Sequence, residues 1–408
     1  MSAGVVAFTL TLLLGIQPVA TDLYLPALPA LGRAFGAPFA AVQLTLSALI
    51  IAFGIAQLAW GPVSDRWGRR PVLLAGLALF VLGGAGAVFA PSIGWLVGWR
   101  ALQGIGMAAA VTCGRSIIRD LYGPAEGARV MSSAMSGLGV LAMLSPLAGS
   151  LTTGLFGWRS ALGATALFGA AALAWAARRC VETLPAANPR ATAPAQLLRN
   201  WRLIGAHPTF AAWTLLLCAS YGGLFTMLAA SSFVFIDVLG VGRLGYGLFL
   251  AANSLCYIAG TRLCRRMLAR HSLPAVSARG AAFSLTGGVS MLALALAGVH
   301  GVWAIALPQW CFAVGHGVQQ PCGQAGAVGP FAGKAGTAAS LSGFLMMAVA
   351  FAVGLLLGRG MNGTVLPMAA GVGMFGTLVA LISWTLVRRH GAPPPAAAAV
   401  AVATDAAV

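Results

Sequence analysis

Residues 61–71 read Gly61-Pro62-Val63-Ser64-Asp65-Arg66-Trp67-Gly68-Arg69-Arg70-Pro71. Apolar runs flank this stretch on both sides, at about residues 41–62 and 71–90. Each run has the roughly 20 mainly apolar residues that an α-helix needs to cross a bilayer. The stretch therefore predicts a short charged turn between two membrane helices, with Gly68 permitting the tight bend.

The composition of the whole chain also indicates a membrane protein. Apolar residues make up 59% of the 408 residues and charged residues only 8%, whereas a soluble domain is typically about one quarter charged. A soluble chain with so few charges could not cover its own surface, and lipid is the solvent that tolerates this composition. The 54 glycines suit the close approach of membrane helices.

Twelve runs along the chain are long and apolar enough to span a bilayer. They are roughly 4–24, 41–62, 71–90, 95–117, 129–152, 159–178, 209–234, 244–267, 276–298, 302–325, 335–357 and 364–387. The first run has no basic residue before it, since the first arginine is Arg33, so we expect a membrane helix there rather than a cleaved signal peptide.

The fold class that follows is an all-α membrane protein with twelve transmembrane helices in two six-helix halves. The longest polar interruption divides the helices six and six. The expected parts are an N-terminal half (1–180), a central cytoplasmic loop (181–208), a C-terminal half (209–390) and a disordered Pro/Ala-rich tail (391–408).

The positive charge predicts the orientation. The net charge is +17, and Lys334 is the only lysine. The arginines cluster in short loops and do not form a basic surface interleaved with aromatic residues, so nucleic acid is not an expected partner. With the N-terminus in the cytoplasm, nineteen Arg and Lys residues fall in inside segments and four in outside loops. We therefore expect a multi-pass protein of the inner (plasma) membrane with both termini cytoplasmic.

Of the seven acids only Asp22 falls within or close to a continuous apolar span, and Arg100 is the one basic residue inside a membrane run that belongs to neither set of loops. The first and fourth helices run in opposite directions, so both residues lie in the outer third of the membrane and a pair is possible. A buried charge without a partner is costly. We interpret Asp22 as a proton-binding carboxylate whose neutral form releases Arg100. The alternative is that Asp22 only caps the exit of the first helix before Pro26.

Other polar groups on apolar helices are candidate substrate contacts. They are Gln17, Gln57, Gln103, Tyr221, Asn253, Tyr257, Gln309, His316, Gln319 and Gln320. Each could instead form an interhelical hydrogen bond, and His316 could be a packing group. The seven scattered cysteines form no CxxC pair, and no phosphate-binding loop, metal cluster or catalytic triad pattern occurs. We expect no enzyme activity, no cofactor and no metal.

Several motifs resemble a known family. The stretch 61–71 closely resembles the major facilitator signature G-x-L-a-D-r-x-G-r-k/r, with Val63 where Leu is more usual. Residues 22–29 (DLYLPALP), 100–106 (RALQGIG) and 115–122 (RSIIRDLY), with the segment from Gly139 to Gly149, resemble the drug/proton antiporter branch. Within that branch the chain is most similar to the bicyclomycin-resistance (Bcr/CflA) family. The resemblance covers nearly the whole chain and is most specific over residues 22–150.

This resemblance implies two halves that rock about a site near the bilayer midplane. It implies a conformational latch formed by Gly61, Asp65, Arg66, Gly68, Arg69, Arg70, Arg119 and Asp120. It also implies an antiporter kink at Ser145, Pro146 and Gly149, with Ser145 where Gly is usual. The expected protein is a monomeric proton-coupled exporter of drugs or other lipophilic small molecules. A carrier of a defined metabolite such as a sugar or amino acid, and a non-transporting membrane sensor, stay open as alternatives.

Overall fold

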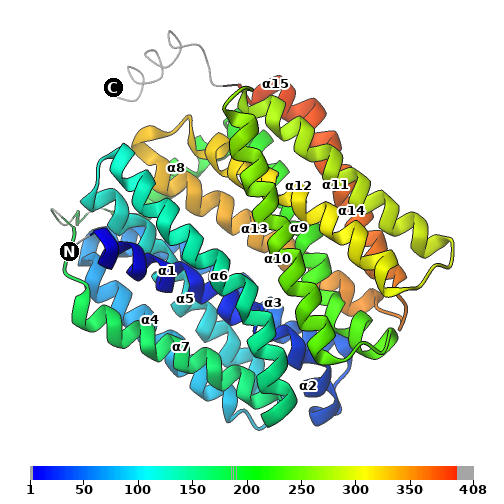
Figure 1. Cartoon of the computed structure of the whole chain (residues 1–408). Coiled ribbons are helices and arrows are strands. Elements are labelled where there is room, and N and C mark those ends of the chain that lie inside the picture. Colours follow the sequence, from blue (N-terminus) through cyan, green and yellow to red (C-terminus); the bar gives the residue numbers. More distant parts are fainter. Residues whose placement is uncertain (1–2, 185, 187, 190, 393–408) are drawn as a thin grey trace.

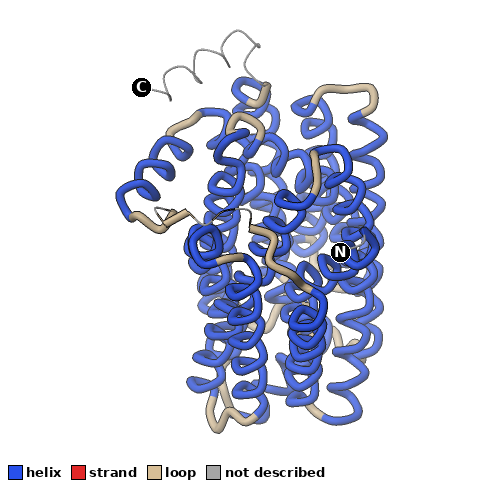
Figure 2. Tube along the Cα trace, turned by 90° about the vertical axis from the view of Figure 1, so that its left-hand side faces the viewer, coloured by secondary structure: helices blue, strands red, loops and turns tan. Residues whose placement is uncertain are grey.

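The computed structural model describes residues 3–184, 186, 188–189 and 191–392. Within that part every regular element is a helix, and the helices are joined by short loops (Figure 2). The all-α prediction is confirmed. The tail expected from residue 391 lies, apart from Gly391 and Ala392, outside the described residues.

The N-terminal half contains six long helices and two short elements. They are α1 (Ala3–Thr21), η1 (Leu25–Ala27), α2 (Leu28–Phe35), α3 (Phe39–Trp67), α4 (Arg69–Val88), α5 (Ile93–Leu121), α6 (Pro124–Phe156) and α7 (Trp158–Arg179). The first transmembrane segment is α1 continued by η1 and α2, because Pro26 and Pro29 interrupt its regular α-helical course.

The C-terminal half follows a short connecting helix, α8 (Pro194–Gly205). Its elements are α9 (Pro208–Phe233), η2 (Val234–Val238), α10 (Arg243–Leu268), α11 (Leu273–Leu296), α12 (Val302–Val328), η3 (Ala332–Lys334), α13 (Ala335–Gly360), α14 (Leu366–Ile382), η4 (Ser383–Val387) and α15 (Arg388–His390). The two halves lie side by side in Figure 1, one coloured blue to green and the other green to red.

Eleven segments of the described chain are long and apolar enough to cross a membrane. The twelfth long helix is α12, which has 27 residues. Its buried polar side chains Gln309, His316 and Gln319 make it less apolar than the others. Because α12 packs among α9, α10 and α11, protein rather than lipid surrounds these groups. The twelve-helix fold agrees with the prediction.

Small residues allow the helices of each half to approach closely. A Cβ added to Gly104 of α5 would collide with the Leu49 carbonyl of α3. No larger residue fits at this crossing, which bears out the expected role of glycine in helix packing.

The halves meet along two pairs of helices, α3 with α13 and α6 with α10. We call the end of the bundle that carries Arg66, Arg119 and Arg388 the basic end. At the opposite end, Arg33 Nη1 lies 2.9 Å from Asp237 Oδ1, and the rings of Phe39 and Phe233 are 4.5 Å apart. Arg33–Asp237 is the one ion pair that joins the halves within the described chain. These contacts hold the halves together at the opposite end.

Candidate functional site

Arg100 lies on α5 and is completely buried. Its Nη1 donates to Gln103 Oε1 at 2.6 Å, and its Nη2 donates to the Ala20 carbonyl at 2.8 Å. The guanidinium also lies over the Tyr24 ring, 4.4 Å from its centre. Its Nε finds no partner among the described residues. Neutral groups alone therefore surround this buried cation, an arrangement that costs stability.

Asp22 directly follows α1 and is partly accessible. Its Oδ1 accepts a hydrogen bond from Thr21 Oγ1 at 2.7 Å, and its backbone N–H donates to the Pro18 carbonyl. The carboxylate interacts electrostatically with the hydroxyls of Tyr221 and Tyr246, which belong to the C-terminal half. Asp22 thus lies where the two halves face each other.

The ion pair between Asp22 and Arg100 that the sequence left possible does not occur among the described residues. Arg100 instead binds the carbonyl of Ala20, two residues before Asp22. The guanidinium is thus bound to the backbone of α1, and the Asp22 carboxylate, which is partly accessible, has Thr21 as its hydrogen-bond partner.

Three predicted contact residues, Tyr221, Tyr257 and His316, lie close together in the C-terminal half. We call them the aromatic wall. His316 of α12 is buried, and its Nδ1 lies 2.9 Å from Ser220 Oγ of α9. The His316 ring centre lies 5.5 Å from that of Tyr257 and 6.4 Å from that of Tyr221. Tyr221 in turn interacts with Gln17 of α1. The structure therefore brings Gln17, Tyr221, Tyr257 and His316 together across the boundary between the halves.

The remaining predicted contacts lie elsewhere. Gln103 supports Arg100, and Gln57 faces Gly343 of α13. Asn253 Oδ1 accepts a long hydrogen bond, 3.4 Å, from Gln309 Nε2. Gln319 is fully buried and uses both ends of its amide on Ser277 of α11. Gln319 links two helices of one half, and we leave it out of the site.

The segment predicted to be kinked lies in the middle of α6. Pro146 has no N–H, so the carbonyl of Ala142 loses its helical partner. Ser254 Oγ of α10 lies 3.4 Å from that carbonyl, across the boundary between the halves. Ser145 Oγ donates to the Leu141 carbonyl at 2.6 Å. A Cβ added to Gly149 would collide with the Leu23 backbone, so this glycine lets α6 touch the chain directly after Asp22.

The turn between α3 and α4 assembles three charged groups of the predicted latch. Arg69 is almost fully buried, with Nη1 2.5 Å from Asp65 Oδ1 and Nε 2.9 Å from Asp120 Oδ2. Gly68 has a φ of 98°, a conformation that glycine adopts without strain, as the sequence predicted. A Cβ added to Gly61 would only touch Thr112 at 3.9 Å, so no close helix contact requires glycine at this position.

The other latch residues connect this turn to its surroundings. Arg66 donates to Thr192 Oγ1 at 2.8 Å, and Arg70 donates to the carbonyls of Cys180 and Ala177. Arg119 lies beside Gly336 at the start of α13, where an added Cβ would be 3.1 Å from its Nη1. The turn therefore contacts both the connecting loop and, through Arg119, the C-terminal half.

Glu182 is a latch residue that the sequence did not reveal. Its carboxylate accepts hydrogen bonds from the backbone N–H groups of Arg69 and Arg70, at 2.9 and 3.1 Å, and from those of Thr183 and Leu184. It thereby caps the positive N-terminal end of α4. Burial alone would raise the pKa of Glu182, but these four hydrogen bonds outweigh it and hold the pKa below its ordinary value.

A family model described as Major Facilitator Superfamily matches residues 10–355. The chain belongs to the major facilitator superfamily. It is a transporter rather than an enzyme, and transporters of this superfamily move small-molecule substrates across membranes.

Curated relatives cover most of this major facilitator chain. Multidrug resistance protein D of Escherichia coli (strain K12) is 29% identical over 336 residues, 82% of this chain and 84% of that protein. The chloramphenicol resistance protein of Pseudomonas aeruginosa is 28% identical over 322 residues, 78% of this chain and 74% of that protein. The bicyclomycin resistance protein homolog of Haemophilus influenzae is 25% identical over 389 residues, 95% of this chain and 98% of that protein. These names agree with the resemblance to the drug-exporting branch.

Solved major facilitator structures share the fold. The partially occluded inward-open conformation of the E. coli xylose transporter XylE matches with a TM-score of 0.73 and 14% identity, covering 95% of this chain and 100% of that one. A bacterial homolog of the human lysosomal transporter Spinster, in an inward-facing conformation, also matches with a TM-score of 0.73, at 15% identity, covering 96% of this chain and 99% of that one. At such identities the likeness establishes the architecture alone.

We expect Gly149→Ala to reduce transport at least about tenfold, because the new methyl group would push the Leu23 backbone and the neighbouring Asp22 out of place. The control is Gly154→Ala on the same helix, where an added Cβ has no atom within 4 Å. Initial transport rates at equal protein level provide the measurement. Equal rates for the two variants would show that the contact between α6 and Leu23 is unimportant.

We expect Glu182→Gln to destabilise the protein at neutral pH by about 1 kcal/mol or less, because the carboxylate is largely exposed and solvent weakens its hydrogen bonds. The pKa of Glu182 is lowered in the folded state. Its contribution is therefore present above the ordinary Glu pKa and is lost as pH falls through the lower folded value. Thermal unfolding of both forms at neutral and acidic pH measures this. A stability difference that stays the same at both pH values would contradict the account.

Proposed function

We propose that this chain is a proton-coupled antiporter that exports drugs or other lipophilic small molecules across the inner membrane, with both termini in the cytoplasm. The observation that supports it most is the completely buried Arg100, bound to the α1 backbone beside the accessible Asp22. Structural ion pairs normally satisfy both partners. Arg100 binds the chain two residues before Asp22, and neither charge has an ion-pair partner among the described residues. Such unpaired charges suit a site whose charges change during a cycle.

The proton step follows from electrostatics. A positive charge nearby favours the carboxylate form of Asp22, and burial away from water favours the neutral form. Movement of the halves that changes either condition would make Asp22 take up or release a proton. In this conformation Arg33 and Asp237 join the halves at the opposite end, which the charge distribution assigns to the outside. Asp22 would then release its proton towards the cytoplasm.

We assign substrate binding to the aromatic wall, which lies across the boundary between the halves from α1. Tyr221, Tyr257 and His316 offer aromatic faces with few polar groups, and Gln17 supplies a polar group from the N-terminal half. An apolar surface with a few polar anchors suits compounds that partition into membranes. The relatives named for resistance to multiple drugs, chloramphenicol and bicyclomycin support this choice of substrate class.

The latch couples this site to the basic end. Arg69 is held by Asp65 and Asp120 within the N-terminal half, while Arg119 next to Asp120 touches α13. Separation of the halves at the basic end would remove the Arg119 contact and leave the Arg69 cluster intact. The cluster would thus keep the N-terminal half together as it moves.

Transport into everted membrane vesicles tests the proposed function. With a proton gradient imposed, vesicles containing the protein should accumulate chloramphenicol or a lipophilic dye above the level in vesicles without it. A protonophore should remove the accumulation. If none of a broad set of lipophilic compounds accumulates while expression is verified, the drug-exporter proposal is wrong, and a defined-metabolite carrier or a sensor replaces it.

A further inference from the structure

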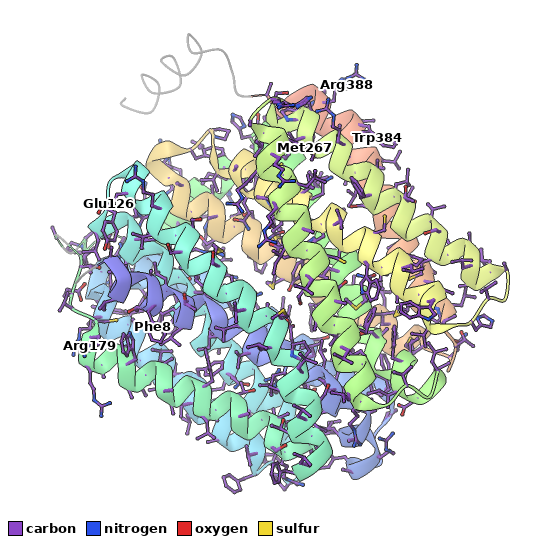
Figure 3. The ribbon with its side chains drawn as sticks, viewed as in Figure 1. Phe8, Glu126, Arg179, Met267, Trp384 and Arg388 are labelled. Carbon is purple, nitrogen blue, oxygen red and sulfur yellow. The ribbon has the colours of Figure 1, made fainter. Side chains whose placement is uncertain are left out.

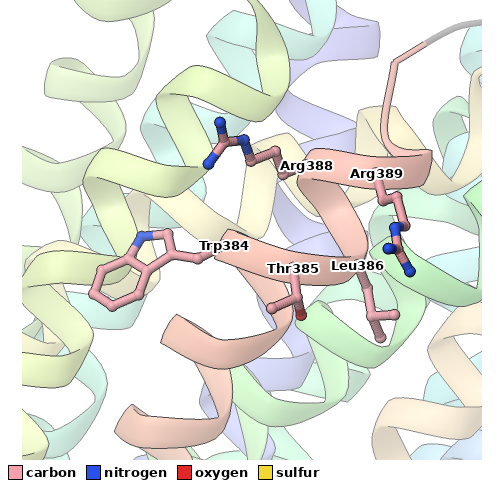
Figure 4. Close-up of a pocket in the computed structure, with 5 residues that line it drawn as sticks. All are labelled: Trp384, Thr385, Leu386, Arg388 and Arg389. Atoms are coloured by element: carbon pink, nitrogen blue, oxygen red, sulfur yellow. The ribbon is translucent and has the colours of Figure 1, made fainter.

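Two adjoining hollows lie at the basic end of the C-terminal half, away from the proposed transport site. One has a volume of about 500 Å³ and is lined by Trp384, Thr385, Leu386, Arg388 and Arg389 (Figure 4). The other, of about 380 Å³, shares Trp384 and Arg388 and is also lined by residues around the start of α11. Figure 3 shows Trp384 and Arg388 at this end of the half, near the last described residues. Nothing in the proposed transport cycle uses them.

A π-helical turn presents the lining residues. The last transmembrane helix passes from α14 into η4 (Ser383–Val387), whose wider turns often mark functional sites. Trp384 and Arg388 are four residues apart and project from one face towards α11 (Figure 4). The Trp384 indole N–H donates to the Ala278 carbonyl at 3.0 Å, and 43% of the side chain remains exposed. The indole is thus fixed beside the hollow, with an apolar face available to lipid.

The start of α11 adds a second source of positive potential. Ser272 occupies the N-cap position without a side-chain cap, and Pro274 in the first turn has no N–H. Both residues line the smaller hollow together with Arg388. The positive end of the α11 dipole therefore faces the same space as the guanidinium, and anions are stabilised at such helix ends.

No acidic residue of this half neutralises the arginines. From residue 209 to residue 392 the sequence contains one acid, Asp237, and it pairs with Arg33 at the opposite end. Arg388 and Arg389 are both exposed. Neither arginine forms an ion pair within the part of the chain that the structure describes, and at a membrane surface the available fixed anions are lipid headgroups.

We propose that these hollows bind the headgroup of an anionic phospholipid such as phosphatidylglycerol. Arg388 and Arg389 donate to the phosphate, and the open start of α11 stabilises its charge. Trp384 lies against the glycerol and upper acyl region, the depth at which tryptophan is enriched in membrane proteins. Exposed Leu386 continues this apolar border, which a lipid would cover and a free phosphate would not. The site requires only that the basic end lie at a membrane surface.

Lipid retention by the purified full-length protein, measured by native mass spectrometry, tests the proposal. We expect wild type to retain phosphatidylglycerol over phosphatidylcholine, and the double variant Arg388→Gln/Arg389→Gln to lose this preference by about tenfold or more. The control removes the same charge from exposed positions on α10, as Arg265→Gln/Arg266→Gln, and should change retention less than about twofold. Equal losses in the two double variants would mean diffuse attraction and would overturn the site.

Two further measurements keep the test decisive if the double variant is poorly folded. Brominated phosphatidylglycerol should quench wild-type tryptophan fluorescence more than brominated phosphatidylcholine does, and Trp384→Phe should remove most of this difference. Quenching that is the same with and without Trp384 would contradict the proposal. Displacement of the retained lipid by inorganic phosphate would assign the hollows to a free phosphate and would also overturn it.

Discussion

Arg100→Met should lose transport by at least about tenfold while the protein keeps or gains thermal stability. The guanidinium is completely buried among neutral groups, and replacement of such a charge by an apolar side chain of similar volume is often neutral or stabilising. Transport should fail because the variant removes a buried cation that the proposed cycle uses and the link from α5 to the Ala20 carbonyl. Initial transport rates and unfolding temperatures of the same preparations measure both effects.

Two comparisons sharpen this result. Gln103→Ala removes one neutral acceptor and leaves the charge in place, so it should impair transport less than Arg100→Met. Arg159→Met removes an exposed arginine at the end of the bundle where α7 begins and should leave transport near the wild-type rate. An Arg100 variant with a lower unfolding temperature but a normal transport rate would show that the residue has a purely structural role.

Asp22→Asn should abolish proton coupling and preserve the fold. The amide is almost the same size as the carboxylate and can still accept the Thr21 hydrogen bond, but it does not take up a proton in the physiological range. Antiport would therefore lose its driving force. Downhill movement of substrate between compartments of equal pH should persist, because the aromatic wall at Tyr221, Tyr257 and His316 is untouched. Glu126→Gln, which removes an exposed carboxylate in the first turn of α6, is the matched control.

Hydropathy predicted the helices well because the bilayer imposes a minimum length on each apolar run. It could not predict α8, a twelve-residue helix in the central loop, since such a helix needs no apolar span. The predicted helices also ended too early at the basic end. The run predicted for 41–62 corresponds to α3, which continues to Trp67. There the helix leaves the membrane and its side chains become polar, although the backbone stays helical.

The site was harder to predict because depth in the membrane does not fix which way a side chain points. The positions of Asp22 and Arg100 along α1 and α5 predicted only a similar depth, and Arg100 does reach the α1 backbone at Ala20. The guanidinium binds a backbone carbonyl, and carbonyls leave no trace in a sequence. Glu182 was missed for the same reason, since its partners are backbone N–H groups. For Gln319 the sequence left substrate contact and interhelical hydrogen bonding open, because its partner, Ser277, lies on a neighbouring helix 42 residues away.

The latch was the most predictable part, because its chemistry lies in side chains that are close in the sequence. Asp65 and Arg69 are four residues apart, and Gly68 between them has the positive φ that the turn requires. The contribution of Asp120 came only from the resemblance to the family, and the structure places its carboxylate on Arg69. Local spacing could not have indicated this contact across 51 residues.

Proton release from everted membrane vesicles on addition of a transported drug tests the coupling role of Asp22 most directly. Vesicles with a preformed proton gradient should release protons when the drug is added to wild type, and the release should vanish in Asp22→Asn and persist in Glu126→Gln. Drug-driven proton release of normal size from Asp22→Asn, at equal protein level, would contradict the account and place the coupling proton elsewhere.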